Sequence, residues 1–252
     1  MDLLSVLFRW VHIVAGILWI GLLYWFNFVN IPFAGGMDGD TKKKVVPELL
    51  PRALFWFRFS ALWTWVTGLL LLLMVFYHGN LMFDEGMGGW NVPAFVMLAV
   101  VLFMFFLYDV LAKSDFGKNI RNMGIAGFII IAAVTYAMIS WSEFSYRAYS
   151  IHIGAMFGTI MMMNVWMRIW PAQQKVIPAI KEGQAPDAAL VAQAGQRSRH
   201  NVYLSVPLVW AMINQHTVVP GAESPLYLLG AVLVGWGAVH FLYEKSTKVK
   251  GF

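Results

Sequence analysis

Seven long apolar stretches set the architecture of this 252-residue chain. A helix that crosses a lipid bilayer needs about 20 predominantly apolar residues. Stretches close to that length or longer run from Leu4 to Ile31, Ala53 to Tyr77, Pro93 to Ala112, Ile120 to Trp141, Tyr149 to Trp170, Asn201 to Val218 and Leu226 to Tyr243. Only 12% of the residues are charged, about half the usual fraction. The sequence therefore predicts an all-α fold, a polytopic membrane bundle of seven transmembrane helices.

Positive charge alternates along the loops that join these stretches. The first, third and fifth loops and the C-terminal tail, which includes Lys250, carry Lys and Arg. The second loop has Asp84 and Glu85 but no Lys or Arg, the sixth also has no Lys or Arg, and the fourth holds only Arg147 as a cation. Because Lys and Arg are enriched in cytoplasmic loops, we expect the N-terminus outside and the C-terminus inside.

Residues 1–252 are expected to form a single transmembrane domain. The only long connection, at about 171–200, is predicted to be a cytoplasmic loop with a short surface helix at 188–196. The first apolar stretch lacks a short core followed by a small-residue cleavage site, so we expect a retained helix rather than a signal peptide. The absence of cysteine excludes disulfides, thiolate metal sites, iron–sulfur clusters and covalently attached haem within these residues. Nothing in the charge distribution indicates nucleic-acid binding.

The histidines suggest a cofactor. On the predicted topology four lie toward the outer surface (His12, His78, His152 and His216) and two toward the inner surface (His200 and His240). His12 and His152 are the deepest outer pair, at comparable depth. Two helices that each present a histidine at one depth can provide both axial ligands of a haem b. The pattern predicts one haem b held by His12 and His152, with His78 and His216 as further candidates and an inner pair as a candidate for a second haem.

Structural explanations compete with these assignments. Histidines at helix ends, such as His78 and His216, are often simply interfacial, and His200 could contact backbone or lipid phosphate. Gly154 and Gly158 form a GxxxG pattern, which is more often a helix-packing face than a cofactor slot. His12 is the hardest to explain structurally, because it lies inside an otherwise apolar helix.

Three charged residues complete the set of candidates. Arg9 lies three residues before His12 and is a candidate cofactor-binding residue. Arg58 and Asp109 share a predicted depth within the membrane, where charges need partners. They could form an ion pair with each other. Alternatively, Arg58 could bind a haem propionate or an anionic substrate.

Three segments carry a family likeness. Arg9-Trp-Val-His-Ile-Val-Ala-Gly-Ile-Leu-Trp-Ile-Gly21 resembles the first helix of the membrane domain of bacterial PuuD-type urate oxidases, the urate oxidase N-terminal family. The segment from His152 to Lys175 and the segment from Arg197 through Asn214-Gln-His216 resemble later helices of that domain. The first motif is also similar to the copper-resistance D and protoporphyrinogen-oxidase-like membrane families.

The resemblance implies an eight-helix membrane domain followed by a periplasmic cytochrome c domain. We expect this chain to depart from it, with seven helices and no cytochrome c domain. It then implies a haem protein of the bacterial inner membrane, in contact with membrane lipid. Such a protein would pass electrons to a separate periplasmic cytochrome c or to respiratory-complex subunits. Urate oxidation is only a hypothesis, because no general base for it can be identified. The alternatives are a copper-handling or transport protein and a non-catalytic subunit of a larger membrane complex.

Overall fold

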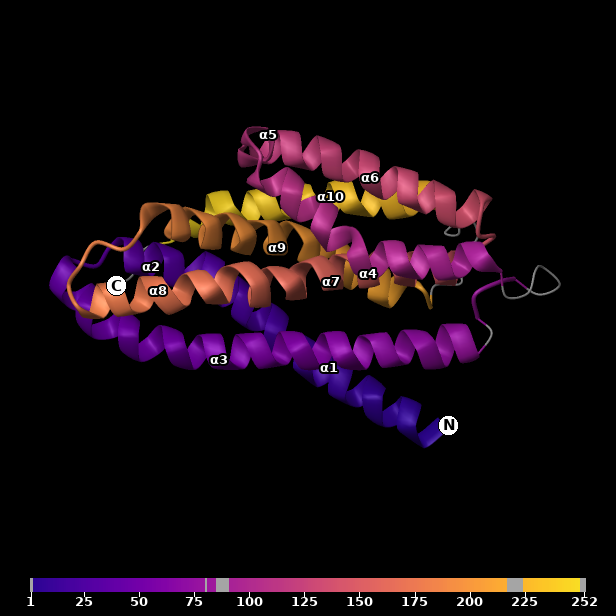
Figure 1. Ribbon diagram of the computed structural model, residues 1–252, viewed down its shortest axis with the longest axis horizontal. Helices are drawn as coiled ribbons and strands as arrows, with labels where there is room; N and C mark the ends of the chain where they lie inside the picture. Colours follow the sequence, from indigo (N-terminus) through magenta and orange to yellow (C-terminus); the bar gives the residue numbers. More distant parts are fainter. Residues whose placement is uncertain (1, 80, 85–90, 217–223, 250–252) are drawn as a thin grey trace. The chain divides into compact units, whose positions relative to one another are not determined.

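The computed structural model describes residues 2–79, 81–84, 91–216 and 224–249 (Figure 1). Within these residues every regular element is helical and no strand occurs, which confirms the predicted all-α class. Glu85, Val218 and Lys250, which the loop and span predictions include, lie outside the described residues.

Six helical segments are long and apolar enough to cross a membrane: Leu3–Gly35, Gly39–His78, Val92–Lys113, Ile120–Ser140, Tyr146–Lys181 and Pro225–Ser246. They contain all or nearly all of six of the seven predicted apolar stretches. The remaining stretch, Asn201 to Val218, begins inside α9 (Ala188–Asn214), which is long enough to span a bilayer. Its polar residues between Arg197 and Asn201 lower its hydropathy and keep it outside that set.

Several spans combine α-helical and π-helical segments. The first consists of α1 (Asp2–Tyr24), η1 (Trp25–Asn30) and α2 (Ile31–Gly35), and the second of α3 (Gly39–Leu71) and η2 (Leu72–His78). Then follow α4 (Val92–Lys113), α5 (Asp115–Lys118), α6 (Ile120–Ser140), α7 (Tyr146–Asn164), η3 (Val165–Ile169), α8 (Trp170–Lys181), α9 and α10 (Pro225–Ser246). π-Helical turns are rare and often occur at functional sites.

The chain divides into two compact units, which are described separately. Unit 1 comprises residues 1–8, 68–160 and 204–236, and unit 2 comprises residues 9–67, 161–203 and 237–252. The division falls inside five helices, namely α1, α3, α7, α9 and α10.

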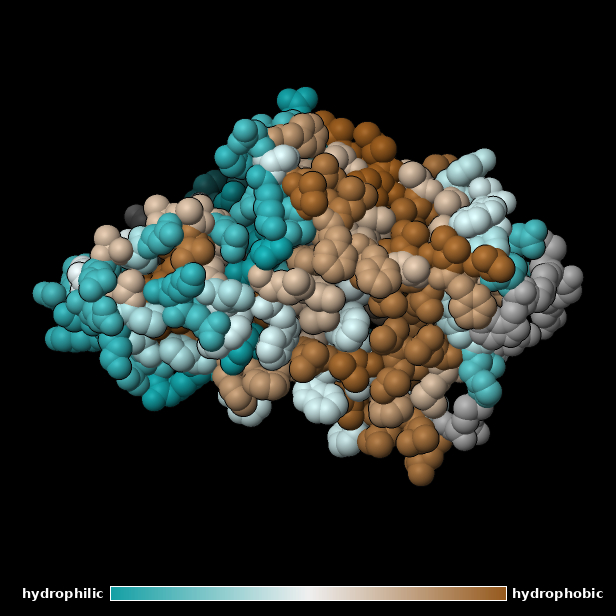
Figure 2. Space-filling model, in the orientation of Figure 1, coloured by the Kyte–Doolittle hydropathy of each residue, from teal (hydrophilic) through white to brown (hydrophobic). Residues whose placement is uncertain are grey.

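In unit 1, α4 and α6 contact each other and are joined through α5 (Figure 1). Their outward faces are apolar: Phe103 and Val110 of α4 and Ile129 of α6 are all more than 60% exposed. Figure 2 shows this apolar surface in brown next to the hydrophilic surface of α5. A continuous apolar face of this kind is expected where helices contact lipid.

The GxxxG pattern of α7 is a packing face in unit 1. A Cβ on Gly154 would lie 3.2 Å from Cβ of Ala211, and a Cβ on Gly158 would lie 3.5 Å from a methyl group of Leu208. Both contacts are with α9. The packing interpretation of this pattern is therefore the one that the structure supports.

The predicted connection at about 171–200 is mostly helical, and its cytoplasmic position stays a prediction. Helix α8 continues to Lys181, and α9 begins at Ala188, after Asp187 accepts a hydrogen bond from the Ala189 N–H at 2.8 Å. The polar residues after Pro171 favoured a loop, although Ala, Gln and Lys are good helix formers. The short helix predicted at 188–196 is the first third of α9.

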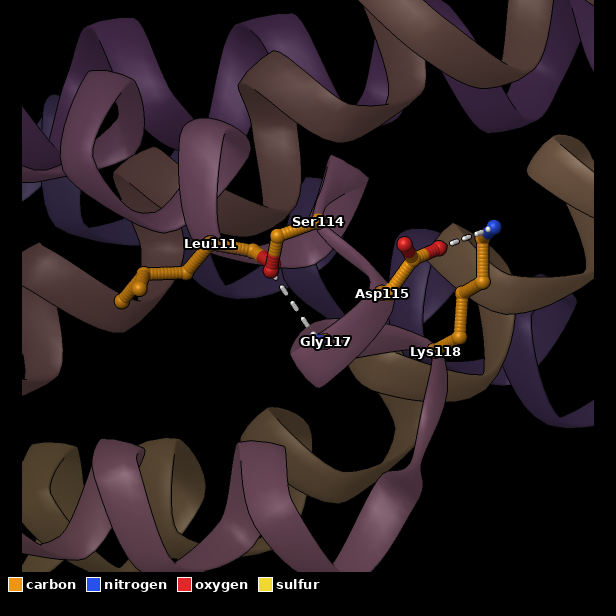
Figure 3. A network of polar contacts seen from close by, with 5 residues as sticks. All are labelled: Leu111, Ser114, Asp115, Gly117 and Lys118. Carbon is orange, nitrogen blue, oxygen red and sulfur yellow. Dashed lines mark hydrogen bonds and ion pairs between the residues drawn. The ribbon is translucent and has the colours of Figure 1, made fainter.

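The turn between α4 and α6 is fixed by Ser114 (Figure 3). Its hydroxyl donates to the Leu111 carbonyl at 2.6 Å and accepts the Gly117 N–H at 3.2 Å, which caps α5. Lys118 Nζ lies 2.6 Å from Asp115 Oδ1 on the exposed side and holds the pKa of the Asp115 carboxyl below its usual value. A Cβ on Gly117 would overlap the Leu111 carbonyl oxygen and lie 2.8 Å from Cα of Ala112.

We predict that Gly117→Ala destabilises the protein by about 1–3 kcal/mol, because the added methyl group meets rigid backbone. Thermal unfolding in detergent measures the change. The matched control is Gly195→Ala in α9, where nothing lies within 4 Å of the new Cβ. Equal melting temperatures for the two variants would show that the turn does not depend on Gly117.

Candidate functional site

His12 of α1 is held by α3 within unit 2. Its Nδ1 lies 2.8 Å from the Thr64 carbonyl oxygen and 3.3 Å from the Thr67 hydroxyl. A carbonyl oxygen can only accept, so Nδ1 carries the proton of the neutral ring. The Thr67 hydroxyl donates to the Trp63 carbonyl at 2.6 Å and can therefore accept from Nδ1 as well. These contacts fix the tautomer and leave the lone pair on Nε2.

Nε2 of His12 has no hydrogen-bond partner among the described residues. One turn later, Gly16 allows close approach of α1 and α3, since a Cβ there would already touch the Thr64 methyl group at 3.7 Å. Metal-binding histidines almost always donate their other ring N–H to a carbonyl, a carboxylate or water. His12 therefore has the chemistry that an axial haem ligand requires, and the residues present fit that role.

His152 of α7 lies in unit 1 and is completely buried. Its Nδ1 is 2.7 Å from the Ala148 carbonyl oxygen, and its Nε2 is 3.0 Å from the Tyr77 hydroxyl. The Phe144 ring packs against it, with ring centroids 4.8 Å apart. Both ring nitrogens are engaged, so Nε2 would have to leave Tyr77 before it could bind iron. Because His12 and His152 belong to different units, their pairing on one haem stays a prediction.

The other histidines occupy varied surroundings. His78 at the end of η2 and His216 just after α9 are exposed. In unit 2, His200 is buried, whereas His240 is exposed and lies 3.5 Å from Glu244 through Nε2. Among the described residues, no three His, Cys, Asp or Glu side chains come together as a metal-binding group. The inner pair predicted from sequence stays a prediction.

The predicted charged partners lie in different units. Asp109, in unit 1, is buried and forms an ion pair with Lys113 at 2.7 Å, one turn along α4. Arg58 lies on α3 in unit 2 and is half-buried. Arg9 is exposed on α1. The ion pair between Arg58 and Asp109 therefore stays a prediction.

Aromatic rings surround the Arg58 guanidinium. Its central carbon lies 3.5 Å from the ring centroid of Trp170, 5.3 Å from that of Trp166 and 5.6 Å from that of Phe59. Trp166 also donates its indole N–H to the Arg58 carbonyl at 3.2 Å. Cation–π contacts of this length are favourable, particularly for Arg. Sequence reasoning missed this arrangement, although the tryptophans were visible in the sequence.

The buried asparagines of unit 2 were also missed. Asn27 of η1 donates to the Leu23 carbonyl and to the Ser198 hydroxyl, each at 2.8 Å, and accepts from the Tyr243 hydroxyl at 2.9 Å. Asn201 of α9 donates to the Met161 carbonyl at 3.0 Å and accepts from Asn164 at 2.9 Å. Their position inside apolar stretches was the available signal, since polar groups within a membrane need protein partners.

Together, these features define a helical, multi-pass membrane protein with polar groups paired inside its helices. A family model described as urate oxidase N-terminal matches residues 31–251. Because the match covers most of the chain, the protein belongs to the urate oxidase N-terminal family. His152 and Arg58 lie inside the matched region and His12 lies before it. Searches of curated proteins and of solved structures returned no match.

Proposed function

We propose that this protein is a haem b-binding electron-transfer protein of the membrane, with His12 as an axial ligand. The observation that carries the proposal is the His12 ring, whose Nδ1 is held by the Thr64 carbonyl while Nε2 makes no hydrogen bond among the described residues. Membership of a family named after an oxidase is consistent with a role in redox chemistry.

Each residue of the His12 site has a defined role in this proposal. The Thr64 carbonyl and the Thr67 hydroxyl orient the imidazole and raise its basicity. A bound haem would supply one-electron redox chemistry at this position. His152 can provide the second ligand only if its Nε2 separates from the Tyr77 hydroxyl. His78 and His216 are further candidates for that position.

We further propose seven membrane spans with the N-terminus outside and the C-terminus inside, with α9 as the additional span. Within α9, Val202, Ser205 and Ala211 are completely buried, so part of the helix faces protein rather than lipid. A helix of this kind can cross a membrane with lower hydropathy than one that faces lipid. On this topology His12 lies in the outer half of the membrane. The electron partner would be a periplasmic cytochrome c or a respiratory-complex subunit in a bacterial inner membrane.

The absorption spectrum of the purified protein tests haem binding. We expect a Soret band and a reduced α-band of b type, and on the order of tenfold less haem in His12→Ala, because removal of an axial ligand weakens binding at least as much as loss of an orienting partner. Lys181→Ala, at an exposed position that is not a candidate ligand, is the control and should keep its haem. Haem retained in full by His12→Ala would refute the ligand assignment.

Two further results bear on the rest of the proposal. His152→Ala should lose haem only if His152 is the second ligand, whereas Tyr77→Phe frees Nε2 and should leave haem binding intact or strengthen it. A preparation that holds copper and no haem would favour the copper-handling alternative over electron transfer.

Single cysteines test the topology, since the natural sequence contains none. We expect Asp84→Cys in the second loop to react with a membrane-impermeant maleimide in intact cells. Lys181→Cys, after the fifth span, should react only once the cells are permeabilised. Both positions are exposed, so access to reagent depends on the side of the membrane. The reverse labelling pattern would invert the proposed orientation.

A further inference from the structure

Several N–H groups of the Arg58 guanidinium make no hydrogen bond to the described residues of unit 2. A guanidinium carries five N–H groups. Within the described part of unit 2, the Arg58 side chain makes a single hydrogen bond, from Nε to the Leu54 carbonyl at 3.3 Å, and no acidic side chain of that unit pairs with it. The side chain is half-buried, so its Nη groups are not sealed inside the protein.

The aromatic rings hold this guanidinium in one place. At 3.5 Å from the Trp170 centroid it lies against the ring face, which leaves its in-plane N–H groups directed away from the ring. The Trp166 ring is anchored in turn by its hydrogen bond to the Arg58 carbonyl. A stacked guanidinium loses less conformational freedom on binding an anion than a freely rotating side chain does.

Arg58 is separate from the His12 site. The face of α3 toward α1 carries Thr64 and Thr67, which contact His12, and Phe57, which contacts Phe26 of η1. Arg58 follows Phe57 by one residue and is therefore rotated by roughly 100° from that face. An anion bound by Arg58 would meet a different side of α3 from a haem bound at His12.

The position of Arg58 along α3 indicates which anion it meets. The exposed Arg52 lies six residues before Arg58, about 9 Å along the helix axis. Lys42, Lys43 and Lys44 lie earlier still in the same helix. The long apolar stretch begins directly after Arg52. Trp56, which follows, is 58% exposed, as expected for an aromatic residue at a membrane surface. An arginine near such a boundary extends its charged end toward the lipid headgroups.

We propose that Arg58, stacked on Trp170 and flanked by Trp166, binds the phosphate of an anionic phospholipid headgroup. The guanidinium fork matches phosphate oxygens with two parallel hydrogen bonds, which an ammonium group cannot reproduce. Basic pockets between helices at the cytoplasmic surface are known to hold such headgroups. The binding chemistry is independent of haem.

Lipid titration with native mass spectrometry on the full chain tests the proposal. Wild-type protein should retain phosphatidylglycerol in preference to phosphatidylcholine, and Arg58→Gln should lower phosphatidylglycerol binding about fivefold, the contribution expected of one interfacial cation. Arg58→Lys keeps the charge without the fork and should bind less lipid than wild type. The control is Arg52→Gln, which removes an exposed arginine of the same helix that pairs with Glu48 and should lower binding less than Arg58→Gln does.

Several outcomes would overturn the proposal. One is equal phosphatidylglycerol binding by wild type and Arg58→Gln, and another is an equal loss in Arg52→Gln, which would indicate diffuse charge attraction. If an equal concentration of inorganic phosphate displaced the lipid, the ligand of Arg58 would be a free phosphate ion rather than a lipid headgroup. If Arg58→Gln fails to fold, as judged by circular dichroism, full phosphatidylglycerol binding by Arg58→Lys would refute the role of the fork.

Discussion

Polar groups inside the apolar helices must find their partners within the protein, because lipid offers none. This requirement explains the most informative contacts of the structure. The Thr64 carbonyl accepts a hydrogen bond from His12, and the Tyr77 hydroxyl is hydrogen-bonded to His152. The Asn27 amide donates through its NH2 group and accepts through its oxygen. Each described π-helical segment contributes to such a contact, through Asn27 of η1, Tyr77 of η2 and Trp166 of η3. The helices are distorted where polar side chains are accommodated.

The sequence was sufficient to predict the regular spans. The stretch Pro93–Ala112 agrees with α4 to within one residue at each end, because Asn91 caps the helix, Pro93 occupies its first turn and Lys113 closes it. The segment after Trp170 was harder, since polar residues are frequent in it, although Ala172, Val176 and Ile177 form a buried helical face. The span predicted at Asn201–Val218 stays a prediction, because hydropathy does not place α9 among the six candidate spans and does not reveal which side chains face protein.

The candidate site was only partly predictable. His12 stood out in the sequence because a histidine in an apolar helix is costly without a partner. Its partners, Thr64 and Thr67, lie 52 and 55 residues away and carry no local signal. The same holds for Tyr77, which occupies the nitrogen of His152 that a metal would need. Depth within a membrane can be estimated from sequence, but the face that a side chain presents depends on packing.

The π-helical segments make the spacing of residues unusually important. A π-turn accommodates one residue more than an α-turn, so deleting a residue from 72–78 would let the helix close into regular α-geometry. Because the extra residue is absorbed within the turn, the helix on either side would keep its orientation, whereas the side chains inside the segment would change position. Tyr77 lies inside this segment, so its contact with His152 depends on the extra residue although neither partner would be replaced. Comparisons among relatives should therefore treat a one-residue gap in this segment as a change of chemistry rather than of length.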